Sequence, residues 1–328
     1  MTMPDLTDLT DLTDLTDPTD PTDPTDLRDR LATVVGIPVV PYDPQGRVDT
    51  ERTALLADRL LDAGVTVLTP NGNTGEFYAL APAERRRVLE VVAGARRPDT
   101  VVVAGVGLDL ETAVADARHA AAHGAQAVMI HQPVVPYLSP DGWVDYNATV
   151  AAAVPELAVL PYVSTTAVAG RHVAELVRRA PNVVGLKYSV PDPVHFAAVR
   201  DDAGHDLLWI AGLAESWAPA YWQAGARGFT SGLVNVAPEV SFALLEALRA
   251  GDGATVARVS RQIRAFEALR ARHGSADNVS VVKEAMHLAG LCDRSVRPPS
   301  HVLDEAARRE VREAVAAWAA PAGEERVA

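Results

Sequence analysis

The sequence predicts an α/β protein built on a (β/α)8 TIM barrel, because eight short β-rich runs alternate with helical patterns over about two hundred residues. Most of these runs are continuously apolar, as expected for parallel strands that are covered on both faces. A doubly wound open sheet is the alternative architecture, but such a sheet usually ends sooner or reverses its direction. We therefore expect a disordered tail at 1–30, the barrel at 31–250 and a C-terminal helical extension at 251–328.

The individual βα units follow from their boundary residues. Pro82 and Glu84 suit the first turn of a helix, whereas Gly64 and Gly124 stand where a helix would stop. The strands are expected at Thr33–Val40, Val65–Pro70, Thr100–Val106, Ala125–His131, Ala158–Val163, Val183–Tyr188, Leu207–Gly212 and Gly228–Leu233. The helices of the barrel include Asp49–Ala63, Pro82–Ala95, Leu110–His123, Arg171–Ala180 and, after the last strand, about Pro238–Arg249.

Three further helical patterns follow the barrel, near Thr255–Arg272, Val279–Ala289 and Val302–Trp318. They lie beyond the eighth helix and form an appendage. Such an addition either covers a face of the barrel or builds a contact between subunits, and both alternatives stay open at this point.

The N-terminal segment from Asp5 to Leu27 repeats Asp-Leu-Thr and then Asp-Pro-Thr. A period of three fits neither a helix nor a strand, and repeated like charge with few large apolar groups does not repay the entropy of ordering. We expect a disordered tail, with an interaction tail as the alternative. Deletion of residues 1–27 is accordingly expected to leave the thermal midpoint unchanged.

The charge and cysteine content exclude several classes of protein. Eight of the acidic residues lie in residues 1–27, so the net charge of −13 leaves −5 for the rest of the chain, which has no basic face for nucleic acid. The single Cys292 excludes an internal disulfide and fits a reducing cytosol. No apolar run is long enough to span a bilayer. We expect a cytoplasmic protein without nucleic-acid or membrane partners.

The lysine content singles out one residue. The chain has 30 Lys and Arg residues, of which only Lys187 and Lys283 are lysine. Lys187 closes the sixth predicted strand, and barrel enzymes place their chemistry at the C-terminal ends of strands. A partly buried lysine can lose its proton and attack a carbonyl, which arginine cannot do. A structural ion pair is the alternative for Lys187, and a solvated or interface position is expected for Lys283.

Two other strand ends carry reactive groups. Tyr162 closes the fifth strand, and neighbouring strands lie roughly 5 Å apart, so its phenol and the Lys187 amine can converge above the barrel. The second strand is followed by a Gly-rich turn, residues 71–76, whose backbone N–H groups and Thr74 hydroxyl can hold a carboxylate. Together the three signals predict one site at the barrel mouth.

With these residues the chain resembles the N-acetylneuraminate lyase and dihydrodipicolinate synthase superfamily of class I aldolases. The resemblance runs from about Thr33 to Pro298. It is carried by Gly72-Asn73-Thr74-Gly75-Glu76, by Tyr162, by Gly185-Leu186-Lys187 placed 25 residues after that tyrosine, by Gly228–Ser231 leading to Asn235–Pro238, and by Lys283 followed by Ala289-Gly290-Leu291.

The resemblance implies a Schiff base between Lys187 and the 2-oxo group of a pyruvate-like substrate. Tyr162 would relay protons, and the turn containing Thr74 would bind the substrate carboxylate. The candidate catalytic residues are Lys187, Tyr162 and Thr74. The candidate substrate-binding residues are Gly72, Asn73, His131, Thr165, Gly212 and Thr230, with packing as the alternative for His131. Neither a metal nor a cofactor is expected, and the superfamily implies a homo-oligomer, most simply a tetramer.

Departures from the synthase pattern narrow the range of substrates that we expect. Val163 and Ala167 stand where the synthase branch has Asn and the Arg for a second carboxylate, and residues 133–136 lack its tyrosine pair. The stretches 73–80 and 136–138 instead look like those of the 5-dehydro-4-deoxyglucarate dehydratase branch. A synthase or another 2-oxo acid aldolase stays open, because dehydration and C–C cleavage begin with the same iminium. A catalytically silent sensor or scaffold is the alternative outside enzymes.

One helical pair of histidines, His119 and His123, has the spacing of a metal site. No glutamate accompanies the two histidines in the sequence, and their helix is expected outside the barrel. We interpret them as a solvated pair.

Overall fold

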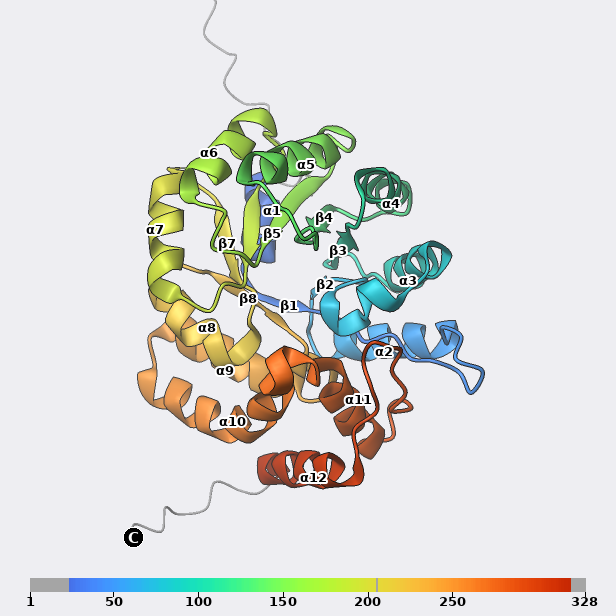
Figure 1. The fold of residues 1–328 in the computed structure, drawn as a ribbon. Coiled ribbons are helices and arrows are strands. Elements are labelled where there is room, and N and C mark those ends of the chain that lie inside the picture. Colours follow the sequence, from blue (N-terminus) through green and yellow to red (C-terminus); the bar gives the residue numbers. More distant parts are fainter. Residues whose placement is uncertain (1–23, 205, 320–328) are drawn as a thin grey trace, which may run out of the picture.

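The computed structural model describes residues 24–204 and 206–319. Eight parallel strands form a closed barrel in the order β1 to β8, and helices surround it (Figure 1). The strands are β1 Val34–Gly36, β2 Val67–Leu68, β3 Val101–Val106, β4 Ala127–Ile130, β5 Ala158–Val163, β6 Gly185–Tyr188, β7 Leu208–Ala211 and β8 Gly228–Ser231. The predicted barrel is therefore confirmed.

Each observed strand lies within its predicted range, and most are shorter than predicted. The difference is greatest for β1, which ends at Gly36. The residues that follow include Pro38 and Pro41, which have no N–H to donate to a neighbouring strand. The ends of the apolar runs leave the hydrogen-bonded ladder early and line the mouth of the barrel as loops.

The helices of the barrel alternate with the strands as predicted. They are α2 Thr50–Asp62, α3 Pro82–Gly94, α4 Leu110–Ala122, α5 Pro140–Ala152, α6 Gly170–Arg179, α7 Pro193–Ala203, α8 Ala214–Gln223 and α9 Pro238–Ala250. Several of these helices begin after a residue whose side chain accepts a hydrogen bond from an otherwise unpaired backbone N–H. The Asp49 side chain accepts from the N–H of Arg52, and the Asp109 side chain accepts from the N–H of Thr112. Short 3₁₀ turns follow two strands, namely η1 Asn73–Gly75 and η2 Phe77–Ala79 after β2, and η3 Leu233–Asn235 after β8.

Alternation along the strands sorts side chains into two apolar layers. One layer fills the barrel, with residues such as Val103, Met129 and Leu160. The other lies between the barrel and the helices and includes Leu186 and Tyr188, the two neighbours of Lys187. Because its neighbours point outward, Lys187 must point into the barrel.

The segment just before the barrel corrects the predicted tail. Residues Pro24–Leu31 form helix α1, at the centre of the ring of helices in Figure 1. Leu27 and Leu31 are buried in the apolar layer that fills the barrel. Those two leucines supply the apolar area that the Asp-rich repeat lacks, so residues 24–30 are part of the folded domain. The expectation that deletion of residues 1–27 leaves the thermal midpoint unchanged is therefore wrong, because that deletion removes the buried Leu27. The rest of the predicted tail, residues 1–23, lies outside the described residues.

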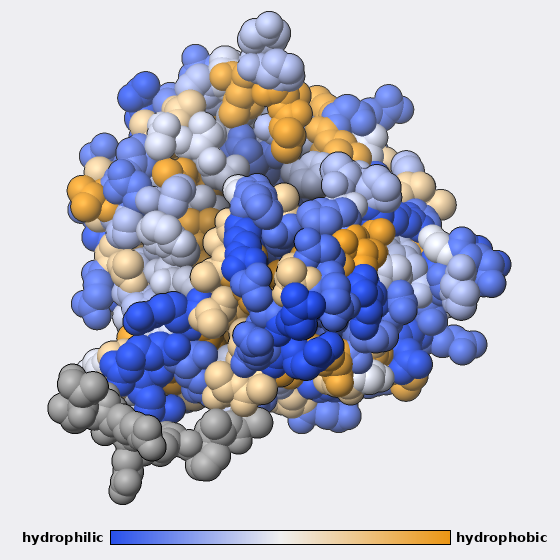
Figure 2. Space-filling model, turned by 60° about the horizontal axis from the view of Figure 1, so that its bottom comes forward, coloured by the Kyte–Doolittle hydropathy of each residue, from blue (hydrophilic) through white to orange (hydrophobic). Residues whose placement is uncertain are grey.

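The predicted appendage consists of α10 Gly253–Ser275, α11 Asn278–Leu288 and α12 Glu305–Ala319. Helix α10 packs on α8 and α9, and α11 contacts the turns η1 and η3 at the barrel mouth. The face that these C-terminal helices present to solvent is largely hydrophilic (Figure 2). The appendage therefore covers part of the mouth.

Among the described helices, none combines the length and apolarity needed to cross a bilayer.

Helix α10 is interrupted near its end. His273, Gly274 and Ser275 have φ values of 53°, 67° and 71°, in the left-handed region. Two of these residues are not glycine, and such backbone strain concentrates at functional sites. The interruption redirects the chain into α11 beside the barrel mouth.

Candidate active site

A cavity of about 210 Å³ opens at the C-terminal ends of the strands, between the barrel and the appendage. Loops after β1, β2, β7 and β8 contribute to it, together with α10 and α11. The lining residues that the sequence had predicted as site residues are Asn73, Thr74, Tyr162, Lys187, Gly212 and Thr230. The structure therefore brings six of the nine candidates to one cavity.

Lys187 lies at the centre of this site. Its side chain is only 3% exposed, and burial lowers the pKa of its amine from the usual 10.5 to about 8. Among the residues that the structure describes, no carboxylate opposes this effect of burial, so none of them holds the amine in a stabilising ion pair. A buried amine with a lowered pKa is partly uncharged at neutral pH, which is the state that attacks a carbonyl.

Tyr162 faces Lys187 across the two neighbouring strands. The register of β5 and β6 pairs these two residues directly, and the Lys187 Nζ lies 4.3 Å from the centroid of the Tyr162 ring. Burial raises the pKa of the Tyr162 phenol, and the nearby Ser189 and Asn73 side chains oppose that rise. The phenol therefore keeps its proton at neutral pH and can give it to a reacting group.

Gly212 leaves room for the lysine. A Cβ at this position would lie 2.9 Å and 3.0 Å from Cγ and Cε of Lys187, and 2.0 Å from Oγ of Ser189. Any larger side chain at the end of β7 would displace the amine. Gly212 was predicted to bind substrate; the structure places it in the cavity lining, where its lack of a side chain leaves space for Lys187.

The turn after β2 carries Thr74 to the cavity wall. Its start and end require left-handed backbone, with φ of 61° at Asn71 and 56° at Glu76. The Asn71 side chain donates to the carbonyl of Arg85 at 2.9 Å, which fixes the start of the turn. Gly72 packs against Ile37 beneath the turn and does not line the cavity. Its contribution is to the conformation of the turn.

The end of the same turn is fixed by a buried ion pair, and this corrects the expectation for Lys283. The Lys283 Nζ donates to Oε2 of Glu76 at 2.5 Å and to the carbonyl of Ser295 at 2.8 Å. Both ion-paired side chains are buried. Lys283 is therefore neither solvated nor free to react. It ties helix α11 to the turn after β2 that carries Thr74.

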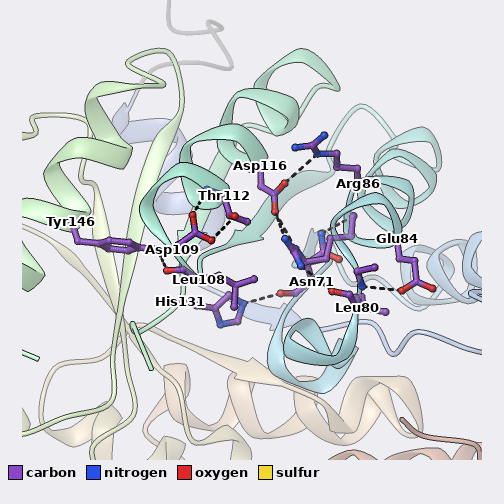
Figure 3. Close-up of polar contacts among 12 residues, drawn as sticks. Asn71, Leu80, Glu84, Arg86, Leu108, Asp109, Thr112, Asp116, His131 and Tyr146 are labelled. Carbon is purple, nitrogen blue, oxygen red and sulfur yellow. Dashed lines mark hydrogen bonds and ion pairs between the residues drawn. The ribbon is translucent and has the colours of Figure 1, made fainter. Parts of the chain in front are cut away.

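His131 does not line the cavity either. Its Nε2 donates to the backbone oxygen of Asn71 at 2.8 Å (Figure 3). Its ring also stacks on Phe77. Burial lowers the pKa of the imidazole to about 3, so it is uncharged. Of the two roles considered for His131, substrate binding and packing, the structure favours packing and support of the turn.

Thr165 lies in the loop after β5, where its hydroxyl accepts a hydrogen bond from the Ala167 N–H. It is also absent from the cavity lining.

Part of the cavity lining was not predicted from the sequence. Helix α8 and the loop before it contribute Leu213, Ala214, Ser216 and Trp217, and the appendage contributes Glu267, Arg270, Ala271, Ser275 and Asn278. The residues of the loop follow Gly212 directly and could have been included. No pattern in the sequence marked the lining residues of the appendage. The packing of α10 over the mouth depends on contacts between segments that are far apart in the sequence.

A buried carboxylate adjoins this missed part. Glu215 on α8 accepts hydrogen bonds from Ser231 and, at 2.5 Å, from Ser241. Burial, together with the neighbouring charge of Glu267, raises the pKa of Glu215 to about 7, and Arg270 and the two serine hydrogen bonds oppose the rise. The pair of Glu267 and Arg270 in the cavity lining therefore has a second, fully buried glutamate nearby.

The histidine pair His119 and His123 lies outside this cavity. The fold does supply the carboxylate that the sequence lacked nearby, since Oε1 of Glu90 on α3 is 3.3 Å from Nε2 of His119. The ligand atoms of the three residues lie within 4.8 Å of one another.

The chain is similar to known proteins over most of its length. A family model described as the dihydrodipicolinate synthetase family matches residues 30–318. The chain is 34% identical to a protein of Methylobacterium radiotolerans named "Probable 5-dehydro-4-deoxyglucarate dehydratase", over 77% of this chain and 84% of that protein. It is 32% identical to a 4-hydroxy-tetrahydrodipicolinate synthase of Phenylobacterium zucineum, over 83% of this chain and 92% of that protein.

A solved structure shows the same fold. The dihydrodipicolinate synthase from Oceanobacillus iheyensis superimposes with a TM-score of 0.86 and 36% identity, over 90% of this chain and 99% of that chain. These matches confirm the predicted relationship. The chain belongs to the dihydrodipicolinate synthetase family of enzymes.

Proposed function

We propose that the protein is a lysine-dependent dehydratase acting on a sugar-acid-derived 2-oxo acid of the 5-dehydro-4-deoxyglucarate type. The observation that carries the proposal is the buried amine of Lys187, with a pKa lowered to about 8, facing the Tyr162 ring in the cavity at the barrel mouth. The names of several relatives support the substrate class.

The first step is formation of an imine. The uncharged Nζ of Lys187 attacks the oxo carbon, C2 when counted from the adjacent carboxylate, and the oxo oxygen leaves as water. Tyr162 supplies the proton that this water needs and becomes a phenolate. Thr74 and the turn around it hold the carboxylate next to C2. The resulting iminium withdraws electrons from C3.

The second step is elimination of water. The Tyr162 phenolate removes a proton from C3, and the electron pair forms an enamine. The enamine expels the hydroxyl from C4, which leaves as water with the proton returned by Tyr162. Hydrolysis of the conjugated iminium then frees Lys187 and an unsaturated 2-oxo acid. In an aldolase the base would instead remove the proton of the C4 hydroxyl, the C3–C4 bond would break to release an aldehyde, and the enamine of pyruvate would remain on Lys187.

Borohydride trapping tests the covalent step. Pyruvate and borohydride should add one substrate to the peptide that contains Lys187, and the peptide with Lys283 serves as an internal control because that amine is ion-paired with Glu76. Lys187→Arg keeps a cation and should abolish trapping. Absence of any label with pyruvate and longer 2-oxo acids would favour the silent scaffold.

A second assay separates dehydration from cleavage. Incubation with 5-dehydro-4-deoxyglucarate should consume the substrate without releasing pyruvate. Release of pyruvate together with an aldehyde would identify an aldolase and would contradict the proposed dehydration.

We also propose that the protein forms a homo-oligomer, most simply a tetramer. Three apolar side chains of the loop after β4 support a contact there, namely Val134, Val135 and Tyr137, with Tyr137 95% exposed. Light scattering should give a particle several times the mass of the 34.8 kDa chain. A single chain at micromolar concentration would overturn this proposal.

A further inference from the structure

A buried arginine of the appendage reaches the active-site cavity. Arg270 on α10 is 7% exposed and belongs to the cavity lining. One of its terminal nitrogens, Nη2, would lie 2.8 Å from a Cβ added to Gly232, and the Thr74 hydroxyl would lie 3.1 Å from the same point. The guanidinium and the Thr74 hydroxyl therefore both lie beside Gly232, just beyond the end of β8.

Two contacts fix the orientation of this guanidinium. Its Nε donates to Oδ1 of Asn278 at 2.9 Å, and its Nη1 donates to Oε1 of Glu267 at 2.6 Å. Within residues 24–204 and 206–319, no partner accepts a hydrogen bond from Nη2. A guanidinium held on two sides loses little conformational freedom when its remaining edge binds a ligand.

The charges of the cavity indicate which ligand that edge suits. Among the described residues that line the cavity, only Lys187 and Arg270 have cationic side chains. The proposed reaction converts the Lys187 nitrogen into an imine and holds the first carboxylate at the Thr74 turn. Arg270 is then the cation that remains for a second anionic group of the substrate.

We propose that Arg270 binds the distal carboxylate of a dicarboxylic 2-oxo acid and thereby selects six-carbon dicarboxylates over monocarboxylates of the same length. This inference rests on the proposed Schiff base at Lys187 and extends it to the far end of the substrate. It also gives the appendage a role, because α10 and α11 hold the arginine over the mouth of the barrel.

Glu267 limits the strength of this interaction. Its carboxylate is paired with the guanidinium, and Glu215 lies nearby, so the wall is not strongly positive overall. Recognition must therefore come from the directed N–H groups of Nη2 rather than from net charge. Replacement of Glu267 by glutamine keeps the shape of the clamp and should strengthen the binding of the distal carboxylate.

Trapping with a matched pair of non-reacting acids tests the inference. 2-Oxoadipate has a carboxylate at C6, and 2-oxohexanoate has a methyl group there, so the two differ only at the distal end. The ratio of their second-order rates of borohydride trapping at Lys187 measures selectivity without requiring dehydration. A hydrogen bond to a charged group contributes about 1.5–3 kcal/mol, so we expect the native protein to prefer 2-oxoadipate by roughly 10-fold to 100-fold.

Variants on helix α10 assign this selectivity to one residue. Arg270→Gln should bring the ratio close to one, Glu267→Gln should raise it, and Arg264→Gln, on the exposed face of the same helix, should leave it unchanged. If the native protein shows no preference, or if the preference survives in Arg270→Gln, the inference is wrong while the Schiff base stands. If pyruvate itself fails to label Lys187, the proposed function is wrong instead. If Arg270→Gln does not fold, the ratio of the two trapping rates in the native protein and in Glu267→Gln still tests whether the inference holds.

Discussion

The pKa of Lys187 sets the pH dependence of imine formation. Burial lowers it from 10.5 to about 8. At pH 7 an amine with a pKa of 8 is uncharged in about one molecule in ten, whereas one with a pKa of 10.5 is uncharged in roughly 0.03% of molecules. The structure therefore predicts an approximately 300-fold larger reactive fraction than an exposed lysine would have. Because desolvation favours the uncharged form, the reactive fraction rises with pH and saturates above the lowered pKa.

Single-turnover trapping with pyruvate between pH 5 and 10 measures this profile. The rate should rise about tenfold per pH unit below pH 7 and level off near pH 9. A small lysine derivative in solution, treated in the same way, gives the reference profile of an exposed amine. A rate at Lys187 that kept rising to pH 10 in parallel with the reference would show that the amine is not desolvated, and the reasoning from burial would fail.

Three further perturbations test the supporting structure. Tyr162→Phe removes the proton donor beside Lys187 and should slow imine formation by roughly 10²-fold or more, as measured by rapid-quench trapping. Lys283→Met leaves Glu76 buried without its partner and should lower the free energy of urea unfolding by about 3–5 kcal/mol, with a second replacement, Glu76→Gln, recovering part of that loss. An unchanged midpoint of urea unfolding in Lys283→Met would mean that water already solvates the ion pair of Lys283 and Glu76. Leu27→Ala should cost about 2–5 kcal/mol because its side chain fills the barrel, whereas Asp29→Ala on the exposed face of α1 should cost less than about 0.5 kcal/mol.

The part of the site that the sequence predicted comes from the ends of strands. Parallel strands in a barrel all end at one mouth, so Lys187 and Tyr162 had to be neighbours once their strands were recognised. The structure pairs them directly in the register of β5 and β6. The Gly-rich turn after β2 could be placed for the same reason. These predictions needed only the order of the strands and the alternation of their side chains.

The predictions that failed depended on contacts between distant segments. Lys283 looks solvated in its own helix, because its buried partner Glu76 lies in the turn after β2. Arg270 was missed because nothing in α10 reveals that the helix crosses the barrel mouth. Leu27 follows an Asp-rich repeat, and only the open N-terminal end of the barrel gives it a place to be buried. Local patterns do not contain this information.

Mass spectrometry of the borohydride-reduced protein identifies the lysine that forms the imine. After incubation with pyruvate we expect one added substrate per chain, located on Lys187 and absent from Lys187→Arg. A label on Lys283, or a folded native protein that no 2-oxo acid labels, would contradict the Schiff-base mechanism.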